Sequence, residues 1–216
     1  MMKAVIFDMD GLMINSERVT YECYVSVLKE MGLTMSEDFY KTLLGKTLPT
    51  AYQLMFDEYG QDFPMDRVLN DVHQLMNNIF DKDGVPIKKG LIELLTYLKE
   101  HQYKTIVATS STRNRVEHLL GLADVMKYFD DSICGDEVTQ GKPHPEVFLK
   151  ACEKLGVEVQ DALVLEDSEA GIEASYRAHI PVICIPDMKY PEHIYQVKTT
   201  AIFSSLDDVI NYLKNL

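Results

Sequence analysis

Two aspartates stand where an apolar run ends near the start of the chain. Asp8 and Asp10 follow residues 4–7, and Gly11 comes directly after them. Carboxylates at the end of a buried strand are unfavourable unless a cation, a proton or hydrogen-bond donors compensate them. A metal site would supply such a cation, whereas a capped surface turn uses Asp and Gly without any ligand. The pair alone leaves both interpretations open.

Polar side chains recur at three later points of the chain: Ser110 and Ser111, then Lys142 in Gly-Lys-Pro-His-Pro, then Glu166, Asp167 and Ser168. Hydroxyls at a strand end bind an anion or cap a helix, and a serine taken alone favours the cap. A lysine is usually a solvated charge, but the neighbouring prolines fix the backbone around Lys142. The Glu–Asp pair alone is typical of an acidic first helical turn.

Six short apolar runs precede or accompany these groups: residues 4–7, 105–109, 132–134, 162–165, 181–185 and 201–203. They are rich in Val and Ile and apolar on both faces, as strands of a covered parallel sheet are. Most are separated by helical patterns such as Leu91, Leu94, Leu95 and Leu98. The alternation predicts an α/β fold with a doubly wound parallel sheet. Such sheets bind ligands beyond the carboxyl ends of their strands, where the polar groups are expected.

One region interrupts the alternation. From about residue 15 to residue 83 the sequence shows helical spacing, with Val19, Cys23 and Val27 four residues apart, and glycines and prolines divide it into about four helices. A turn at 83–86 leads back to the α/β pattern. We therefore expect an α/β core of residues 1–14 and 84–216 and a helical domain of residues 15–83, inserted after the first strand.

Composition limits the classes of protein that this chain can be. It has 216 residues and a formal net charge of −13, which argues against binding to nucleic acid or an anionic membrane. Its four cysteines form no CxxC pair, so reduced thiols in a reducing compartment are expected. The N-terminal apolar run ends at Asp8 before a signal peptide is complete, and no run approaches membrane-span length. We expect a cytoplasmic protein.

The order and spacing of the polar groups resemble the four motifs of the haloacid dehalogenase-like hydrolases. Asp-x-Asp-Gly follows the first strand, Ser the second, Lys-Pro the third and Glu-Asp the fourth, and the resemblance spans nearly the whole chain. The inserted helical region is similar to the cap domain of that family, and the core to its Rossmann-like sheet. Three stretches are similar to the β-phosphoglucomutase and phosphatase group: Phe-Asp-Met-Asp-Gly-Leu, Ala-Thr-Ser-Ser and Leu-Glu-Asp-Ser-Glu-Ala-Gly. Gly45-Lys46 and residues 182–187 resemble pseudouridine-5′-phosphatases.

The resemblance implies a phosphatase that acts on a small phosphorylated metabolite. In that family Asp8 would be the nucleophile that forms an aspartyl-phosphate, and Asp10 the acid and base. Ser110 and Lys142 would hold phosphoryl oxygens, aided by the backbone around Met9, Gly11 and Ser111. Mg²⁺ is the implied cofactor, and the implied ligands are Asp8, the backbone carbonyl of Asp10, Asp167 and, directly or as a partner, Glu166.

Four residues are candidates for contacts with the leaving group. Lys46 and Thr47 lie before a helix in the cap region, where a solvated lysine beside a helix cap is an equal alternative. Arg113 and Asn114 follow the Ser110 loop and either reach the substrate or lie on the surface of a first helical turn. We expect a monomer, because this kind of cap usually seals the site within one chain.

Other functions stay open beside the phosphatase. A phosphomutase must anchor a second phosphate in the cap, but Leu48 and Pro49 occupy the place where the resembling mutases carry an Arg, although Lys46 could contribute charge. A receiver-type signalling domain is shorter and lacks the insertion. A non-catalytic relative that binds a phosphorylated ligand is disfavoured by the intact motif set, and a nicotinamide enzyme by the lack of GxGxxG after a strand.

Overall fold

A computed structural model describes residues 2–216 of the chain, which divides into two compact units. The α/β unit is built from the chain up to Asn15 and from Val85–Leu216, and the helical unit is Ser16–Gly84. The predicted boundaries lie one residue earlier at both junctions. That these units act as a catalytic core and a cap stays a proposal.

The α/β unit contains one parallel sheet, with six strands in the described residues 2–216, in the order β3-β2-β1-β4-β5-β6. The strands are β1 Ala4–Phe7, β2 Lys104–Ala108, β3 Asp131–Ile133, β4 Ala162–Glu166, β5 Val182–Cys184 and β6 Ala201–Ile202. The order reverses between β1 and β4, which is the arrangement of a doubly wound sheet. The predicted fold class is thus confirmed, and each strand lies within about one residue of its predicted run.

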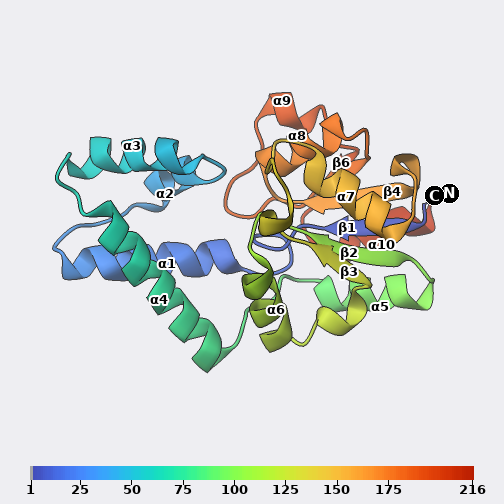
Figure 1. Ribbon diagram of the computed structural model, residues 1–216, viewed down its shortest axis with the longest axis horizontal. Coiled ribbons are helices and arrows are strands. Elements are labelled where there is room, and N and C mark those ends of the chain that lie inside the picture. The colour runs from blue at the N-terminus through green and yellow to red at the C-terminus, as the bar shows by residue number, and fades with distance from the viewer. Residues whose placement is uncertain (1) are drawn as a thin grey trace. The chain divides into compact units, whose positions relative to one another are not determined.

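Helices cover both faces of this sheet (Figure 1). They are α5 Leu91–Glu100, α6 Arg113–Leu122, α7 Glu146–Leu155, α8 Glu169–Arg177, α9 His193–Gln196 and α10 Asp207–Lys214, with 3₁₀ turns η1 Met126–Tyr128, η2 Gly135–Glu137 and η3 Val159–Asp161. α7 and α8 pack on one face, and α5 lies with α10 on the other (Figure 1). The strands are therefore buried on both sides, which explains why their sequences are continuously apolar rather than alternating.

The alternation of side chains along β1 divides the core between those two faces. Ala4 and Ile6 pack with Phe148 of α7 and Ile172 of α8, whereas the ring of Phe7 meets Phe129 edge-on with centroids 5.5 Å apart. All of β1 is fully buried. Burial of a side chain such as Ile6 stabilises the fold by about 1.5–3 kcal/mol, so the strand is held firmly where its carboxyl end emerges.

The helical unit consists of α1 Ser16–Glu30, α2 Glu37–Leu43, α3 Leu48–Tyr59 and α4 Met65–Asp83, as its sequence pattern predicts. α1 and α4 form its main pair, with buried residues four apart on α1 at Val19, Cys23 and Val27. On α4 the buried stripe includes Val68, and Leu69 is only partly buried. The buried side chains of α4 recur every three or four residues, as one face of a helix requires: Met65, Val68, Val72, Met76 and Phe80.

The two segments that leave and re-enter the α/β unit run side by side. Ile14 forms an antiparallel bridge with Ile87, the Asn15 N–H donates to the Pro86 carbonyl at 2.8 Å, and the Lys88 N–H donates to the Met13 carbonyl at 2.8 Å. The helical unit is thus inserted into the α/β unit through one paired connection.

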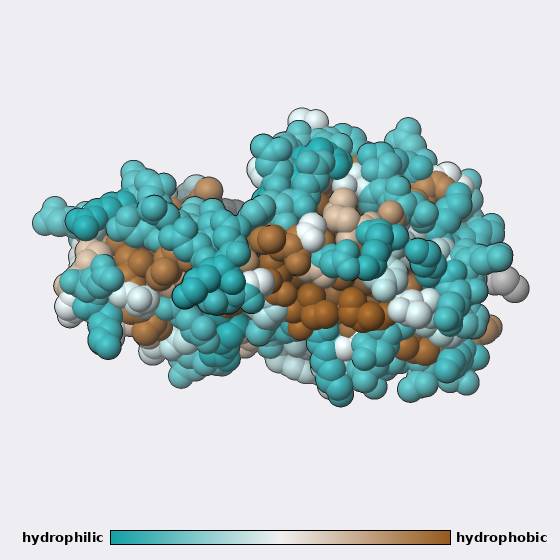
Figure 2. All heavy atoms as spheres, turned by 90° about the horizontal axis from the view of Figure 1, so that it is seen from below, coloured by the Kyte–Doolittle hydropathy of each residue, from teal (hydrophilic) through white to brown (hydrophobic). Residues whose placement is uncertain are grey.

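Hydrophilic side chains predominate on the face drawn in Figure 2, with hydrophobic ones showing between them.

All four cysteines are buried and free. Within residues 2–216, no helix combines the length and the apolar character needed to cross a membrane.

Candidate active site

The carboxyl ends of β1, β2 and β4 lie at one level of the sheet. Phe7 of β1 is in register with Val107 of β2 and with Leu165 of β4, and the Asp8 N–H still donates to the Leu165 carbonyl at 3.1 Å. Asp8 therefore emerges between its two neighbouring strands. The polar residues that follow those strands, far apart in sequence, share this edge.

Lys142 is the centre of the charged group at this edge. Its Nζ donates to Asp8 Oδ1 at 2.5 Å, to Glu166 Oε1 at 2.6 Å and to the Ala108 carbonyl at 3.0 Å. The ammonium also lies 4.8 Å from the centre of the Phe148 ring. The Lys142 side chain is only 5% exposed, so the loop before α7 holds it in a fixed direction. Pro145 occupies the N-cap of α7.

Burial and charge act in opposite directions on these groups. Burial raises the pKa of Asp8, to about 8; the Lys142 ammonium opposes this rise, and Glu166 adds to it. Burial by itself would lower the pKa of Lys142, but the carboxylates of Asp8 and Glu166 outweigh that effect and leave it raised. One ammonium therefore does not fully balance the negative charge of the site.

Three carboxylates at this edge fit a metal ion. Asp8, Glu166 and Asp167 each offer one carboxylate oxygen, and these oxygens lie within 4.8 Å of one another. Hard oxygen ligands with an excess of negative charge suit a divalent cation, which would also stabilise the ionised form of Asp8. The side chains that the sequence places after β1 and β4 are thus close enough to share one ion.

Glu166 has contacts that favour a supporting role over direct ligation. It is fully buried, its Oε1 accepts from Lys142, and its Oε2 accepts from the Asp167 N–H at 3.0 Å and the Ser168 N–H at 3.0 Å. The Ser168 hydroxyl donates to the same oxygen at 2.9 Å and accepts from the Gly171 N–H, capping α8 as predicted. Glu166 therefore fixes both Lys142 and the turn that presents Asp167.

Two glycines allow the backbone to approach these carboxylates. A Cβ on Gly171, in the first turns of α8, would lie 1.8 Å from the Glu166 carboxylate carbon. A Cβ on Gly11 would lie 2.2 Å from Asp167 Oδ2, and Gly11 has a φ of +81°. Close packing thus explains why glycine occupies a helix position that it disfavours.

Ser110 lies in the exposed loop that leads from β2 to α6, and Thr112 rather than Ser110 occupies the N-cap of α6. The loop is supported by the turn that follows β3, because the Gly135 N–H donates to the Ser111 carbonyl at 2.8 Å. A Cβ on Gly135 would lie 2.1 Å from the Ser110 carbonyl oxygen. The backbone of Ser110 is thus packed directly against this turn.

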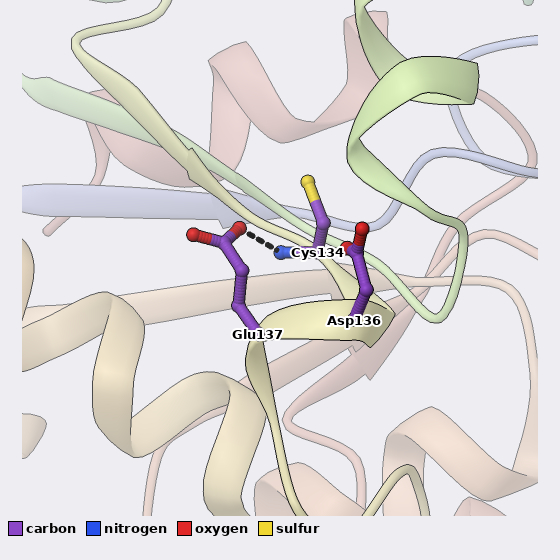
Figure 3. A group of neighbouring side chains, drawn as sticks. All are labelled: Cys134, Asp136 and Glu137. Atoms are coloured by element: carbon purple, nitrogen blue, oxygen red, sulfur yellow. Dashed lines mark hydrogen bonds between the residues drawn. The ribbon is translucent and has the colours of Figure 1, made fainter.

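The same turn contains a second group of potential ligands, Cys134, Asp136 and Glu137 (Figure 3). Its carboxylates already have structural partners. Glu137 accepts from the Cys134 N–H, drawn as the dashed line, and from the Arg113 guanidinium, and Asp136 accepts from the Arg113 N–H at 3.1 Å. These contacts make the group a support for the start of α6.

Asp10 is held apart from the Lys142 group by its own donors. Ser111 Oγ donates to Asp10 Oδ2 at 2.7 Å, and Arg115 Nη2 donates to Asp10 Oδ1 at 3.0 Å. The Ser111 N–H is used by Thr109 Oγ1 at 3.1 Å. Sequence reasoning placed Ser111 at the substrate and, in the first turn of α6, selected Arg113 and Asn114 rather than Arg115, because the motif spacing does not show which side chain of that turn faces Asp10.

The remaining predicted residues lie at different places. Met9 is fully buried behind the Asp8 loop. Arg113 begins α6 and donates to Ser132 Oγ and to the Ser132 carbonyl, which favours the first-turn alternative over a substrate contact, and Asn114 is exposed. Lys46 and Thr47 belong to the helical unit, where Thr47 is the N-cap of α3 and Lys46 is exposed.

The fold and this edge together define an α/β enzyme whose site lies where doubly wound sheets bind their ligands. The comparison with protein families is in agreement. The model for haloacid dehalogenase-like hydrolases matches residues 5–185, and the chain belongs to this family.

Relatives with assigned activities are similar over most of their length. A phosphorylated-carbohydrate phosphatase of Thermotoga maritima is 31% identical over 179 residues, 83% of this chain and 82% of the relative. A candidate pseudouridine-5′-phosphatase of Drosophila melanogaster is 29% identical over 212 residues, 94% and 89% of the two chains. A solved structure of a candidate β-phosphoglucomutase from Thermotoga maritima is 27% identical, covers all of both chains and has a TM-score of 0.82.

Proposed function

We propose that the protein is a Mg²⁺-dependent phosphatase that hydrolyses a small phosphorylated metabolite, of the sugar phosphate or nucleoside monophosphate type, through an aspartyl-phosphate. The observation that carries this proposal is the buried contact of Lys142 with both Asp8 and Glu166, with Asp10 two residues further on. The names of the similar phosphatases and the family assignment support it.

The proposed reaction has two phosphoryl transfers. In the first, a carboxylate oxygen of Asp8 attacks phosphorus, the bond from phosphorus to the ester oxygen breaks, and Asp10 gives its proton to that oxygen. In the second, Asp10 takes a proton from water as the water oxygen attacks phosphorus. The bond from phosphorus to the Asp8 oxygen then breaks, which frees inorganic phosphate and restores the carboxylate.

Lys142 and Ser110 have the positioning role in both transfers. Lys142 would bind a phosphoryl oxygen with the same ammonium that contacts Asp8, and Ser110 would bind another from the exposed loop after β2. Phosphoryl transfer depends mainly on such positioning and on charge stabilisation. A local positive group also explains how a chain with a net charge of −13 accepts an anionic substrate.

Asp8 and Asp167 would hold the metal ion, with Glu166 fixing the turn of Asp167. Bound Mg²⁺ supplies charge that reduces repulsion between the carboxylate nucleophile and the phosphate. Mg²⁺ is chosen because all the offered ligands are hard oxygens.

The helical unit would act as the cap that selects the leaving group, with Lys46 and Thr47 as candidate contacts. We also propose a cytoplasmic monomer without nucleic acid or membrane partners, in keeping with the net negative charge and the free cysteines. A phosphomutase is the second candidate, because the solved candidate β-phosphoglucomutase matches the whole chain.

The test is phosphate release from a panel of sugar phosphates, nucleoside monophosphates, pseudouridine 5′-phosphate and phosphoglycolate, with Mg²⁺ or with EDTA. We expect release from one or a few members, lost in EDTA and restored by excess Mg²⁺. Conversion of glucose 1-phosphate to glucose 6-phosphate without release would favour the mutase. Full activity in EDTA would remove the metal from the mechanism. A lack of both phosphate release and glucose phosphate conversion would point to a binding protein.

A further inference from the structure

The carboxylate of Asp10 is held from both sides by one short segment of chain. Ser111 donates to Oδ2 at 2.7 Å and Arg115 donates to Oδ1 at 3.0 Å. We propose that Arg115 is the positioning residue for Asp10, whose guanidinium orients this carboxylate for proton transfer to the leaving group and from water. The inference rests on the proposed function and deepens it.

Two donors on two oxygens define the plane of a carboxylate. Held by Ser111 alone, the Asp10 side chain could turn about its last torsion, because that torsion is broad and only weakly restricted. A hydrogen bond from a charged donor is also stronger than a neutral one. The side chains of Arg115 and Asp10 are 28% and 24% exposed, so solvent screens their attraction only in part.

Arg115 itself is placed by a rigid element. It lies in the first turn of α6, whose inner face is anchored by the buried side chains of Val116, Leu119 and Leu120. The same stretch of chain carries Ser110, the proposed phosphate contact. One helix start therefore sets the position of the acid and base relative to the phosphate.

The two cations of the site serve different carboxylates. Lys142 contacts Asp8 and Glu166, whereas Arg115 contacts Asp10. Lys142 thus pairs with Asp8, the proposed nucleophile, and Arg115 pairs with Asp10, the proposed acid and base. Removal of Arg115 should thus misalign proton transfer and leave the binding of phosphate unchanged.

The test is a cycle of variants measured with the best substrate from the panel. Arg115→Met should lower kcat by about 10- to 100-fold, part of the 10²–10⁴ that a positioned acid and base contributes, with an unchanged KM. Arg115→Lys should restore part of that loss because it keeps the charge. In an Asp10→Asn background, Arg115→Met should cause no further loss, because two residues that act as a unit are not additive.

A leaving group that needs no proton gives an independent measure. With p-nitrophenyl phosphate, the first release of p-nitrophenolate should be nearly as fast in Arg115→Met as in the wild type. Arg177→Met is the matched control, since it removes an arginine paired with Glu173 on the surface of the same unit. It should leave kcat and KM unchanged.

The outcomes separate the two proposals. Suppose that the wild type turns over a substrate. The positioning role is then overturned, while the phosphatase stands, if Arg115→Met keeps the wild-type kcat, or if it lowers kcat by the same factor in the Asp10→Asn background as in the wild type. A wild type that releases no phosphate from any substrate overturns the proposed function and this inference with it.

Discussion

At the scale of residues, Lys142 determines how the charges of the site are arranged. It is buried beside two carboxylates, and a buried ammonium without such partners would be strongly unfavourable. Loss of one partner of a buried ion pair commonly costs about 3–5 kcal/mol. The contacts of Lys142 with Asp8 and Glu166 therefore also hold the loop before α7 against the ends of β1 and β4.

Replacement of Asp8, the proposed nucleophile, should separate activity from folding. We expect Asp8→Asn to lower phosphate release by about 10³-fold or more, because an amide cannot attack phosphorus. The fold should stay intact, because Glu166 remains as the anionic partner of Lys142, and an amide has nearly the shape of a carboxyl group and keeps an oxygen that can accept from the ammonium. The measurement is phosphate release together with a thermal unfolding curve.

Asp161→Asn is the control for that substitution. It makes the same chemical change in a carboxylate that pairs with Lys3 elsewhere in the α/β unit. Activity should stay at the wild-type level. Near-wild-type activity in Asp8→Asn would remove Asp8 as the nucleophile.

The sequence predicted which residues meet at the sheet edge better than it predicted their partners. Asp8, Lys142 and Glu166 follow apolar runs, and parallel pairing brings such positions together. The contacts of Asp10 with Ser111 and Arg115 depend on side-chain directions at the start of α6, which periodicity does not encode. The same limit applies to Arg113, whose guanidinium turns to Ser132.

At the scale of elements, the backbone of α8 packs directly against the side chain at the end of β4. Gly171 brings the helix backbone against Glu166, and Ser168 caps the helix while it contacts the same carboxylate. The end of β4, the Ser168 cap and the start of α8 are therefore packed together and fix the position of Asp167.

Gly171→Ala should disrupt the packing of α8 against Glu166. The new Cβ would lie 1.8 Å from the Glu166 carboxylate carbon, and overpacking of this kind destabilises by about 1–3 kcal/mol. This exceeds the ~1 kcal/mol that alanine contributes over glycine in a helix. We expect a lower urea midpoint and reduced phosphate release.

Gly121→Ala in α6 is the matched control, because nothing lies within 4 Å of its Cβ position. It should leave stability unchanged or raise it by up to about 1 kcal/mol. Equal urea midpoints for the two alanine variants would contradict the close packing of α8 on Glu166.

The sequence predicted where the strands and helices lie better than it predicted the residues at which they begin and end. The strand runs and the helices between them follow from periodicity, whereas the exact start of α7, directly after Pro145, does not. On α4, Val68 is fully buried while the adjacent Leu69 is only partly buried. Periodicity does not resolve such neighbours, because packing against another helix, α1 in this case, decides which side of a broad apolar stripe is buried.

At the scale of the whole molecule, the helical unit is attached through the paired segments at Ile14 and Ile87. Because these segments already lie side by side, a short linker can join them. We expect a variant with residues 16–84 replaced by a short Gly-Ser linker to fold cooperatively, since the sheet and its covering helices are all retained.

Activity of this variant would test the proposed cap role. It should hydrolyse the panel members with little discrimination, measured as a narrower spread of kcat/KM than in the full chain. A shortened protein that keeps the full chain's preference would show that selection lies in the α/β unit. Loss of the cooperative unfolding transition would show that the units do not fold independently.

The residues that Lys142 joins are distant along the chain: Asp8 lies 134 positions before it and Glu166 lies 24 positions after it. The site therefore exists only when β4 has taken its place beside β1, after some 150 residues of chain have been synthesised or refolded between them. Contacts of such long range form late and slowly. A nascent chain whose β4 has not yet left the ribosome therefore has no assembled candidate site, and the proposed activity can appear only after β4 has paired with β1.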